Sequence, residues 1–268
     1  MINEIMNLPW GRLFLMMLSI YCLFCFLAWI YADRILFPAP ETPGYSDDDI
    51  NVRIALPDGK VIRCNHYESE SSSLCILFSH GNGEDLGGVN KYLNAWKGSE
   101  WDLLAYDYPG YGLSDGSPSE ENCYLAIEAA YKFIIEKLGF KPNQIVLWGR
   151  SLGTGPTLHI AETKEVGGII LESPFTSAFR TVTEIQVIPW DRFPNVSRAP
   201  SIRCRSLVIH GDLDEVVPLR QGRKIYELLA GPKEFIEIKG ANHNDLSLVG
   251  AEIYESGIKD FLKSIVEG

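Results

Sequence analysis

The sequence predicts an α/β protein, in which helices cover both faces of a largely parallel sheet and one apolar helix precedes it. From about Ile50 onward, short runs rich in apolar and β-branched residues alternate with longer segments of helical spacing. Several of the short runs are apolar throughout, which is typical of strands buried on both faces. Near the amino terminus, no charged residue occurs between Leu13 and Ala32.

The apolar run at residues 13–32 is long enough to cross a bilayer, because a helix of this length spans about 30 Å. A cleaved signal peptide would have a shorter apolar region that ends in small residues, whereas this run ends in Trp29-Ile30-Tyr31-Ala32. A buried globular helix is the other interpretation, but this run is apolar on all faces. We expect a single-pass anchor that follows a short tail at residues 1–12.

The orientation of this helix is only weakly indicated by its flanking charges. Arg12 stands on one side, and Arg34 and Arg53 follow on the other. If Arg12 dominates, the positive-inside rule places the large domain on the non-cytoplasmic side, which is the orientation we expect. Residues 33–50 contain three prolines, a glycine and an acidic cluster, so we expect a linker there.

Residues 51–268 predict one domain, and its elements follow in order. The first two strands flank Pro57-Asp58-Gly59 as a hairpin, and one long helix begins after Ser119 as N-cap and ends before Gly139 as C-cap. Residues 174–200 leave room for a short cap only. The expected strands are 52–56, 61–67, 74–79, 101–106, 145–148, 168–172, 206–210 and 234–238, and the expected helices are 119–138, one ending near 161, 219–229 and 245–266.

The composition is typical of a globular protein and argues against several kinds of partner and site. The 268 residues suffice for one core, and 46% hydrophobic and 22% charged residues are ordinary for a globular chain. A formal net charge of -11 argues against a nucleic-acid partner. Cys22 and Cys25 form a CxxC pair inside the apolar run, without partner histidines, and the other four cysteines are scattered. We therefore expect free thiols and neither a metal site nor a disulfide framework.

Gly149-Arg150-Ser151-Leu152-Gly153 matches the GxSxG pattern and is the strongest chemical motif in the chain. Five residues of this kind recur by chance in a chain rich in glycine and serine. Here, however, the motif follows an apolar strand and opens a helix, which is the sharp turn that pushes a nucleophilic serine out of the backbone. The position therefore predicts Ser151 as a nucleophile.

A serine hydroxyl becomes a nucleophile when an imidazole accepts its proton and a carboxylate orients that imidazole. His243 lies in the loop between the last strand and the last helix, where the base is expected, whereas His210 ends a strand and is expected to be structural. The residues themselves leave the acid open among four carboxylates: Asp212, Asp214, Glu215 and Glu172.

Four motifs carry a resemblance to a known family: His80-Gly81-Asn82-Gly83, DYPGYGLS at 107–114, GRSLGTGP at 149–156 and HGxxDxxVP at 210–218. Over roughly residues 50–265 the chain resembles the α/β-hydrolase family, in the branch of single-domain, membrane-associated serine hydrolases that includes depalmitoylating proteins and bacterial relatives. The resemblance implies the α/β-hydrolase fold, with a mostly parallel, doubly wound sheet.

The resemblance also implies roles for individual residues. In the HGxxDxxVP motif the orienting acid is the aspartate, which is Asp214 here. The oxyanion would be bound by the backbone N–H groups of Leu152 and Asn82, with Gly83 as the alternative to Asn82. His80 is expected to support this loop. Nothing in these motifs calls for a metal or an organic cofactor.

Together these features predict a membrane-anchored serine hydrolase that cleaves carboxylic esters or thioesters through an acyl-serine intermediate. The expected partners are a small-molecule or acyl substrate and the membrane, and the oligomeric state is left open. A peptidase acting on short peptides and a non-catalytic scaffold with the same fold are the alternatives.

The depalmitoylating relatives are attached by lipidated amino-terminal cysteines, whereas a spanning helix is expected in this chain. Apolar cap residues such as Phe175, Trp190 and Phe193 either line an acyl pocket or cover the sheet edge.

Overall fold

The computed structural model describes residues 9–70, 72–94, 96, 100–183 and 185–267. The chain divides into two compact units, Met1–Phe37 and Pro38–Gly268. The first contains the helix α2, Pro9–Leu36, which extends the expected span of 13–32 by four residues at each end. The most apolar 18-residue window within Trp10–Leu36 has a mean hydropathy of 2.4, and the helix is long and apolar enough to cross a membrane.

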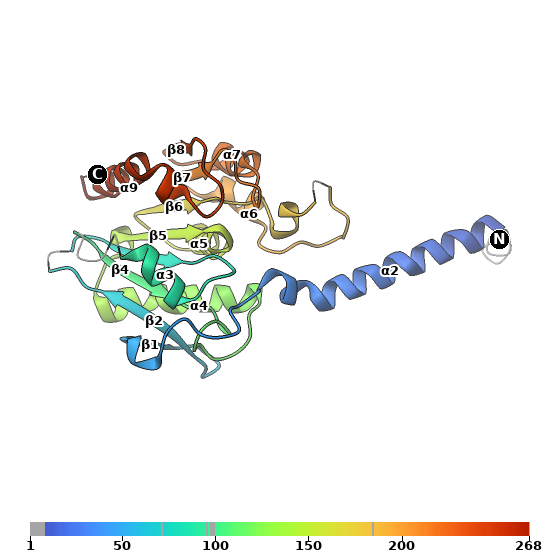
Figure 1. Cartoon of the computed structure of the whole chain (residues 1–268), viewed down its shortest axis with the longest axis horizontal. Helices are drawn as coiled ribbons and strands as arrows, with labels where there is room; N and C mark the ends of the chain where they lie inside the picture. The colour runs from blue at the N-terminus through green and yellow to red at the C-terminus, as the bar shows by residue number, and fades with distance from the viewer. Residues whose placement is uncertain (1–8, 71, 95, 97–99, 184, 268) are drawn as a thin grey trace. The chain divides into compact units, whose positions relative to one another are not determined.

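The second unit is built on one eight-stranded sheet with the order β1-β2-β4-β3-β5-β6-β7-β8 (Figure 1). The pairs β1–β2 and β2–β4 are antiparallel, and every other pair of neighbours is parallel. This confirms the expected hairpin and the mostly parallel sheet. The strands are β1 (Val52–Ala55), β2 (Val61–Tyr67), β3 (Cys75–Ser79), β4 (Asp102–Tyr106), β5 (Ile145–Arg150), β6 (Gly168–Glu172), β7 (Arg205–Gly211) and β8 (Lys233–Ile238).

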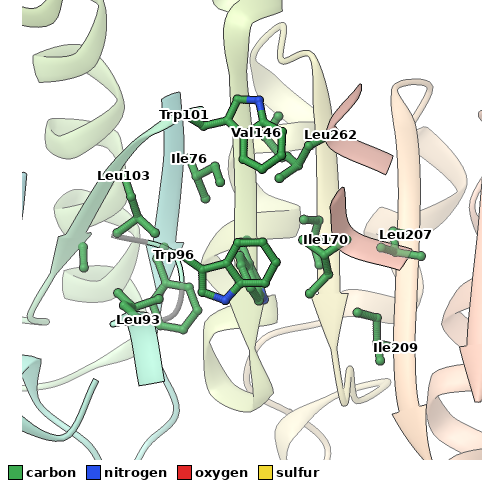
Figure 2. Packing of buried hydrophobic residues seen from close by; sticks show 14 of the residues in the cluster. Ile76, Leu93, Trp96, Trp101, Leu103, Val146, Ile170, Leu207, Ile209 and Leu262 are labelled. Carbon is green, nitrogen blue, oxygen red and sulfur yellow. The ribbon is translucent and has the colours of Figure 1, made fainter. Parts of the chain in front are cut away.

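The central strands β3, β4, β5 and β6 are buried at every residue, as their apolar runs predict. Alternate side chains point to opposite faces. On one face, Ile76, Val146 and Ile170 pack with Leu93 and Leu262 (Figure 2). The equally buried residues on the other face include Leu77, Leu104 and Leu147.

Helices close both faces of the sheet. The face seen in Figure 2 is covered by α3 (Leu86–Leu93) and α9 (Ala251–Glu267), which both contribute to its core. The remaining long helices are α4 (Glu120–Phe133), α5 (Thr154–Thr163) and α7 (Leu219–Leu228), and two single turns are α6 (Asn195–Arg198) and α8 (Leu246–Val249). Helix α3 was not among the expected helices, because glycines occupy two of its eight positions.

Two expected helices differ in detail from their structure. The helix expected at 119–138 is capped by the Ser119 side chain, as predicted, but its last turn, Ile134–Leu138, is a π-helix that ends at Gly139 in the left-handed region. The helix expected at 245–266 is interrupted at Gly250. A Cβ at Gly250 would lie 2.5 Å from the Ile238 side chain, so close packing on β8 requires glycine here, and glycine has low helix propensity.

Part of the segment expected to be a linker is packed into the domain. Ile50 is buried in the core, and the Gly44 N–H donates a hydrogen bond of 2.6 Å to Asp85. The Tyr45 hydroxyl donates to Asp107 at 2.7 Å. The prolines and acidic residues predicted a linker here, but composition does not reveal contacts with residues far along the sequence.

Candidate active site

The turn between β5 and α5, at residues 149–153, holds Ser151 in a strained conformation. It is called the nucleophile turn here because the motif predicts a nucleophile in it. Its φ is 50°, in the left-handed region that residues with side chains seldom adopt. The turn is compact because its glycines admit no side chain: a Cβ at Gly153 would lie 2.0 Å from the Ser79 carbonyl oxygen, and one at Gly149 would lie 2.4 Å from the Gly153 oxygen. This is the strand-to-helix turn that the motif predicts.

Ser151, His243 and Asp214 form one hydrogen-bonded chain, although they are far apart in the sequence. The distance from Ser151 Oγ to His243 Nε2 is 2.9 Å, and that from His243 Nδ1 to Asp214 Oδ2 is 2.7 Å. Because the carboxylate can only accept, Nδ1 carries the proton and Nε2 is left to accept the serine proton. His243 and Asp214 are buried, and Ser151 is partly exposed.

Asp214 is held in place by the turn that follows β7. Its Oδ1 accepts hydrogen bonds from the backbone N–H groups of Val216 (3.0 Å) and Val217 (2.7 Å). Burial would raise the pKa of Asp214, but hydrogen bonds from His210 and His243 outweigh this effect and hold the pKa well below its usual range. The carboxylate is therefore ionised at neutral pH, as an orienting acid must be.

The other candidate acids have different partners. Asp212 Oδ1 accepts from the Gly240 N–H at 2.6 Å. Glu172 is buried and accepts hydrogen bonds from the hydroxyls of Tyr92 (2.6 Å) and Tyr254 (2.9 Å). Glu215 is exposed. His210, expected to be structural, is fully buried and places its Nε2 2.7 Å from the Val217 carbonyl oxygen.

The loop after β3, residues 80–83, lies against Ser151 and is called the oxyanion loop here because the oxyanion donors are expected in it. A Cβ at Gly81 would lie 3.8 Å from Ser151 Cβ. The Asn82 carbonyl oxygen accepts a hydrogen bond of 2.8 Å from the Tyr111 hydroxyl, which fixes the path of the loop. Leu152, the residue after Ser151, is buried. The loop that contains Asn82 therefore packs against the turn that holds Ser151 and Leu152.

Arg150, which directly precedes Ser151 in the GxSxG motif, connects three parts of the site. Its guanidinium donates to Glu84 at 2.5 Å and to Asn244 at 2.9 Å, and its Nε lies 3.3 Å from Glu172. Glu84 in turn accepts from the Gly81 N–H at 3.1 Å. The Arg150 side chain therefore connects the turn of Ser151 with the oxyanion loop and with the loop that contains His243 and Asn244. Sequence reasoning missed it, because these partners are 66 and 94 residues away.

The cap segment contains both buried and exposed apolar side chains. Phe175 and Phe193 are buried, and the Phe193 ring packs on α5, where a Cβ at Gly155 would lie 2.4 Å from it. Ile185 and Val187 are exposed. Phe193 therefore covers α5.

Among the residues that the structure describes, no group of three or more His, Cys, Asp or Glu side chains is arranged to hold a metal ion. All six cysteines are free thiols. A hydroxyl that is hydrogen-bonded to an oriented imidazole, as Ser151 is to His243, is an arrangement suited to nucleophilic chemistry.

Comparison with known proteins agrees with this geometry. Residues 75–192 match the family model described as alpha/beta hydrolase fold. Human alpha/beta hydrolase domain-containing protein 17B is 35% identical over 204 residues, which cover 75% of this chain and 69% of the relative. The structure of an esterase from Pyrococcus furiosus superposes with a TM-score of 0.72 at 18% identity, over 86% of this chain and 99% of the esterase.

A monoacylglycerol lipase from Paleococcus ferrophilus superposes with a TM-score of 0.60 at 21% identity, over 75% of this chain and 98% of the lipase. At these identities the solved structures establish the fold, and the human relative establishes the family. The chain therefore belongs to the alpha/beta hydrolase family.

Proposed function

We propose that the protein is a membrane-anchored serine hydrolase, which cleaves carboxylic esters or thioesters through an acyl-Ser151 intermediate. The observation that carries the proposal is the continuous hydrogen-bonded chain from Ser151 through His243 to Asp214. In an arrangement of this kind the imidazole acts as general base and the carboxylate keeps it in the reactive tautomer.

The reaction would proceed in two halves. Ser151 Oγ attacks the acyl carbonyl while His243 Nε2 accepts its proton, and Asp214 stabilises the resulting imidazolium. The N–H groups of Leu152 and Asn82 bind the developing oxyanion. His243 then protonates the leaving oxygen or sulfur as the tetrahedral species collapses to acyl-Ser151. In the second half, His243 activates a water molecule that releases the acid.

Helix α2 supports the membrane part of the proposal, because it carries no charged residue between Leu13 and Ala32 and only 6% of its most apolar window is buried. We propose that it anchors the hydrolase domain on the non-cytoplasmic side. Protease digestion of sealed, right-side-out vesicles would test the side. Loss of the domain without detergent supports this orientation, and protection of the domain contradicts it.

Hydrolysis of a panel of p-nitrophenyl esters of increasing chain length, with a thioester and an aminoacyl amide alongside, tests the reaction class. We expect turnover of esters and thioesters by the wild type, and a decrease in kcat of roughly 10⁴-fold or more in Ser151→Ala. Turnover of the aminoacyl amide alone would identify a peptidase instead. Undiminished ester hydrolysis by Ser151→Ala would remove this residue from the mechanism.

A further inference from the structure

The segment of residues 44–50, called the strap here, joins the hydrolase domain beside the oxyanion loop. The Gly44 N–H donates to Asp85 Oδ2 at 2.6 Å, and the other oxygen of the same carboxylate caps α3 by accepting from Gly88 N–H at 3.1 Å. At its other end, Ile50 is buried in the core. The strap is therefore fixed at both ends, and Tyr45 lies between them.

Tyr45 places its hydroxyl in a space that Gly112 leaves open. A Cβ at Gly112 would lie 2.4 Å from the Tyr45 oxygen and 2.2 Å from Asp107 Oδ2. The hydroxyl donates to Asp107 Oδ2 at 2.7 Å and accepts from the Leu113 N–H at 2.9 Å. Burial and the charge of Asp107 both raise the pKa of Tyr45, so the hydroxyl keeps its proton and remains a donor.

The second oxygen of Asp107 faces the first residue of the oxyanion loop. Asp107 Oδ1 accepts from the Leu86 N–H at 2.9 Å and lies 3.2 Å from His80 Nε2. His80 and Asp107 are both fully buried. Burial alone would lower the pKa of His80, but the close contact with the Asp107 carboxylate outweighs burial and raises it. Tyr45 therefore fixes the carboxylate that holds the His80 ring.

The His80 ring in turn fixes the peptide bond that precedes Asn82. His80 Nδ1 lies 2.7 Å from the Gly81 carbonyl oxygen, which can only accept, so this nitrogen carries a proton and donates. No described peptide bond is cis, and in a trans peptide the C=O and N–H groups point in opposite directions. A Gly81 oxygen held toward the ring therefore directs the Asn82 N–H away from it.

We propose that Tyr45 is a positioning residue for the hydrolase, which acts through Asp107 and His80 to orient the Asn82 N–H as an oxyanion donor. This inference rests on the proposed function, in which that N–H binds the oxyanion. It gives one residue of the strap, Tyr45, a role in the reaction. An oxyanion donor acts on the tetrahedral species more than on the bound substrate, so its misplacement lowers kcat more than it raises KM.

The test compares Tyr45→Phe with Ser46→Ala in the full chain, in detergent. Both variants delete one hydroxyl from the strap, but the Ser46 hydroxyl bonds only to Asp49 at the exposed surface (2.8 Å). We expect kcat for a p-nitrophenyl ester to fall about tenfold in Tyr45→Phe with KM unchanged, since complete loss of a donor costs roughly 10²- to 10³-fold. The inhibition constant of a trifluoromethyl ketone, which forms a tetrahedral adduct on serine, should rise by the same factor. Ser46→Ala should match the wild type in both.

Thermal unfolding of each variant separates positioning from stability. A Tyr45→Phe variant that is folded at the assay temperature and keeps kcat within twofold of the wild type overturns the inference. So does an equal change in Ser46→Ala. If Ser151→Ala retains the activity, the proposed function itself fails, whereas an inactive Ser151→Ala beside a fully active Tyr45→Phe removes only the role of the strap.

Discussion

At Asp214, burial raises the pKa of the carboxyl group and hydrogen bonds lower it, and the hydrogen bonds have the larger effect. At Glu172, burial prevails and raises the pKa, although Arg150 opposes it. Two carboxylates at the ends of neighbouring strands thus differ in environment. Only the first is bonded to His243, and the second is enclosed by Tyr92, Tyr254 and Arg150. Sequence spacing left both open as the acid, because the hydroxyls around Glu172 come from distant helices.

Exchange of each carboxyl for its amide should separate the two roles. Asp214→Asn removes the acceptor that keeps the proton on His243 Nδ1, and we expect kcat to fall by roughly 10³- to 10⁴-fold. Glu172→Gln keeps the size of the side chain and leaves the Ser151–His243–Asp214 chain intact, so we expect kcat within about tenfold of the wild type. Steady-state kinetics on one p-nitrophenyl ester measures both. The opposite order would make Glu172 the acid.

The depressed pKa of Asp214 also predicts how stability depends on pH. Because the folded-state pKa lies below the ordinary value of 3.8, the carboxylate stabilises the folded state above about pH 4, and this contribution is lost as the pH falls toward the folded pKa. The difference in thermal unfolding temperature between wild type and Asp214→Asn should therefore be largest near pH 7 and should narrow below pH 4. A difference that is constant from pH 7 to pH 3 would contradict this account.

At the scale of elements, hydrophobic period and turn residues were sufficient to predict all eight strands, their hairpin and the position of the nucleophile turn. What they could not predict depends on close approach between distant segments. Helix α3 was missed because its glycines have low helix propensity, yet Gly87 is required there: a Cβ would lie 2.3 Å from the Gly44 oxygen of the strap. The contacts of Arg150 and Tyr45 were missed because they also join segments that are far apart in the sequence.

The nucleophile turn should tolerate no side chain at Gly153, since its Cβ would overlap the Ser79 carbonyl oxygen. We expect Gly153→Ala to lower the free energy of unfolding by about 3 kcal/mol or more. Gly88→Ala is the matched control, because the position is helical and a Cβ added there would lie 3.9 Å from its nearest contact, Glu84 Cβ. We expect no loss there and a gain of up to about 1 kcal/mol. Denaturant titration in detergent measures both, and equal stability of the two variants would refute the steric argument.

At the scale of the whole molecule, the chain combines a hydrolase domain with a helix whose apolar side chains are mostly exposed. Composition alone was sufficient to predict this helix, because no charged residue occurs between Leu13 and Ala32. The same composition could not reveal that the segment after it supports the active site. The family resemblance indicates neither feature, since it begins at the domain.

If α2 spans the bilayer, charged residues at its centre should prevent stable insertion. We expect the wild type to remain in the membrane pellet after an alkaline carbonate wash, and Leu18→Arg/Leu23→Arg to be released. Each arginine near the centre of a spanning helix costs roughly 2.5–3.5 kcal/mol. Arg12→Ala, outside the apolar run, is the control and should stay in the pellet. Release of the wild type by carbonate would exclude a spanning anchor.

The central claim is that Ser151 is the nucleophile of this protein. It is tested most directly by treating the full chain with a fluorophosphonate probe and locating the modified residue by tandem mass spectrometry of the digested protein. We expect one phosphonylated serine, Ser151, and a rate of modification that falls sharply in His243→Ala, because the imidazole activates the hydroxyl. Modification at another residue, or an unmodified Ser151 in a protein that still hydrolyses the ester, would contradict it.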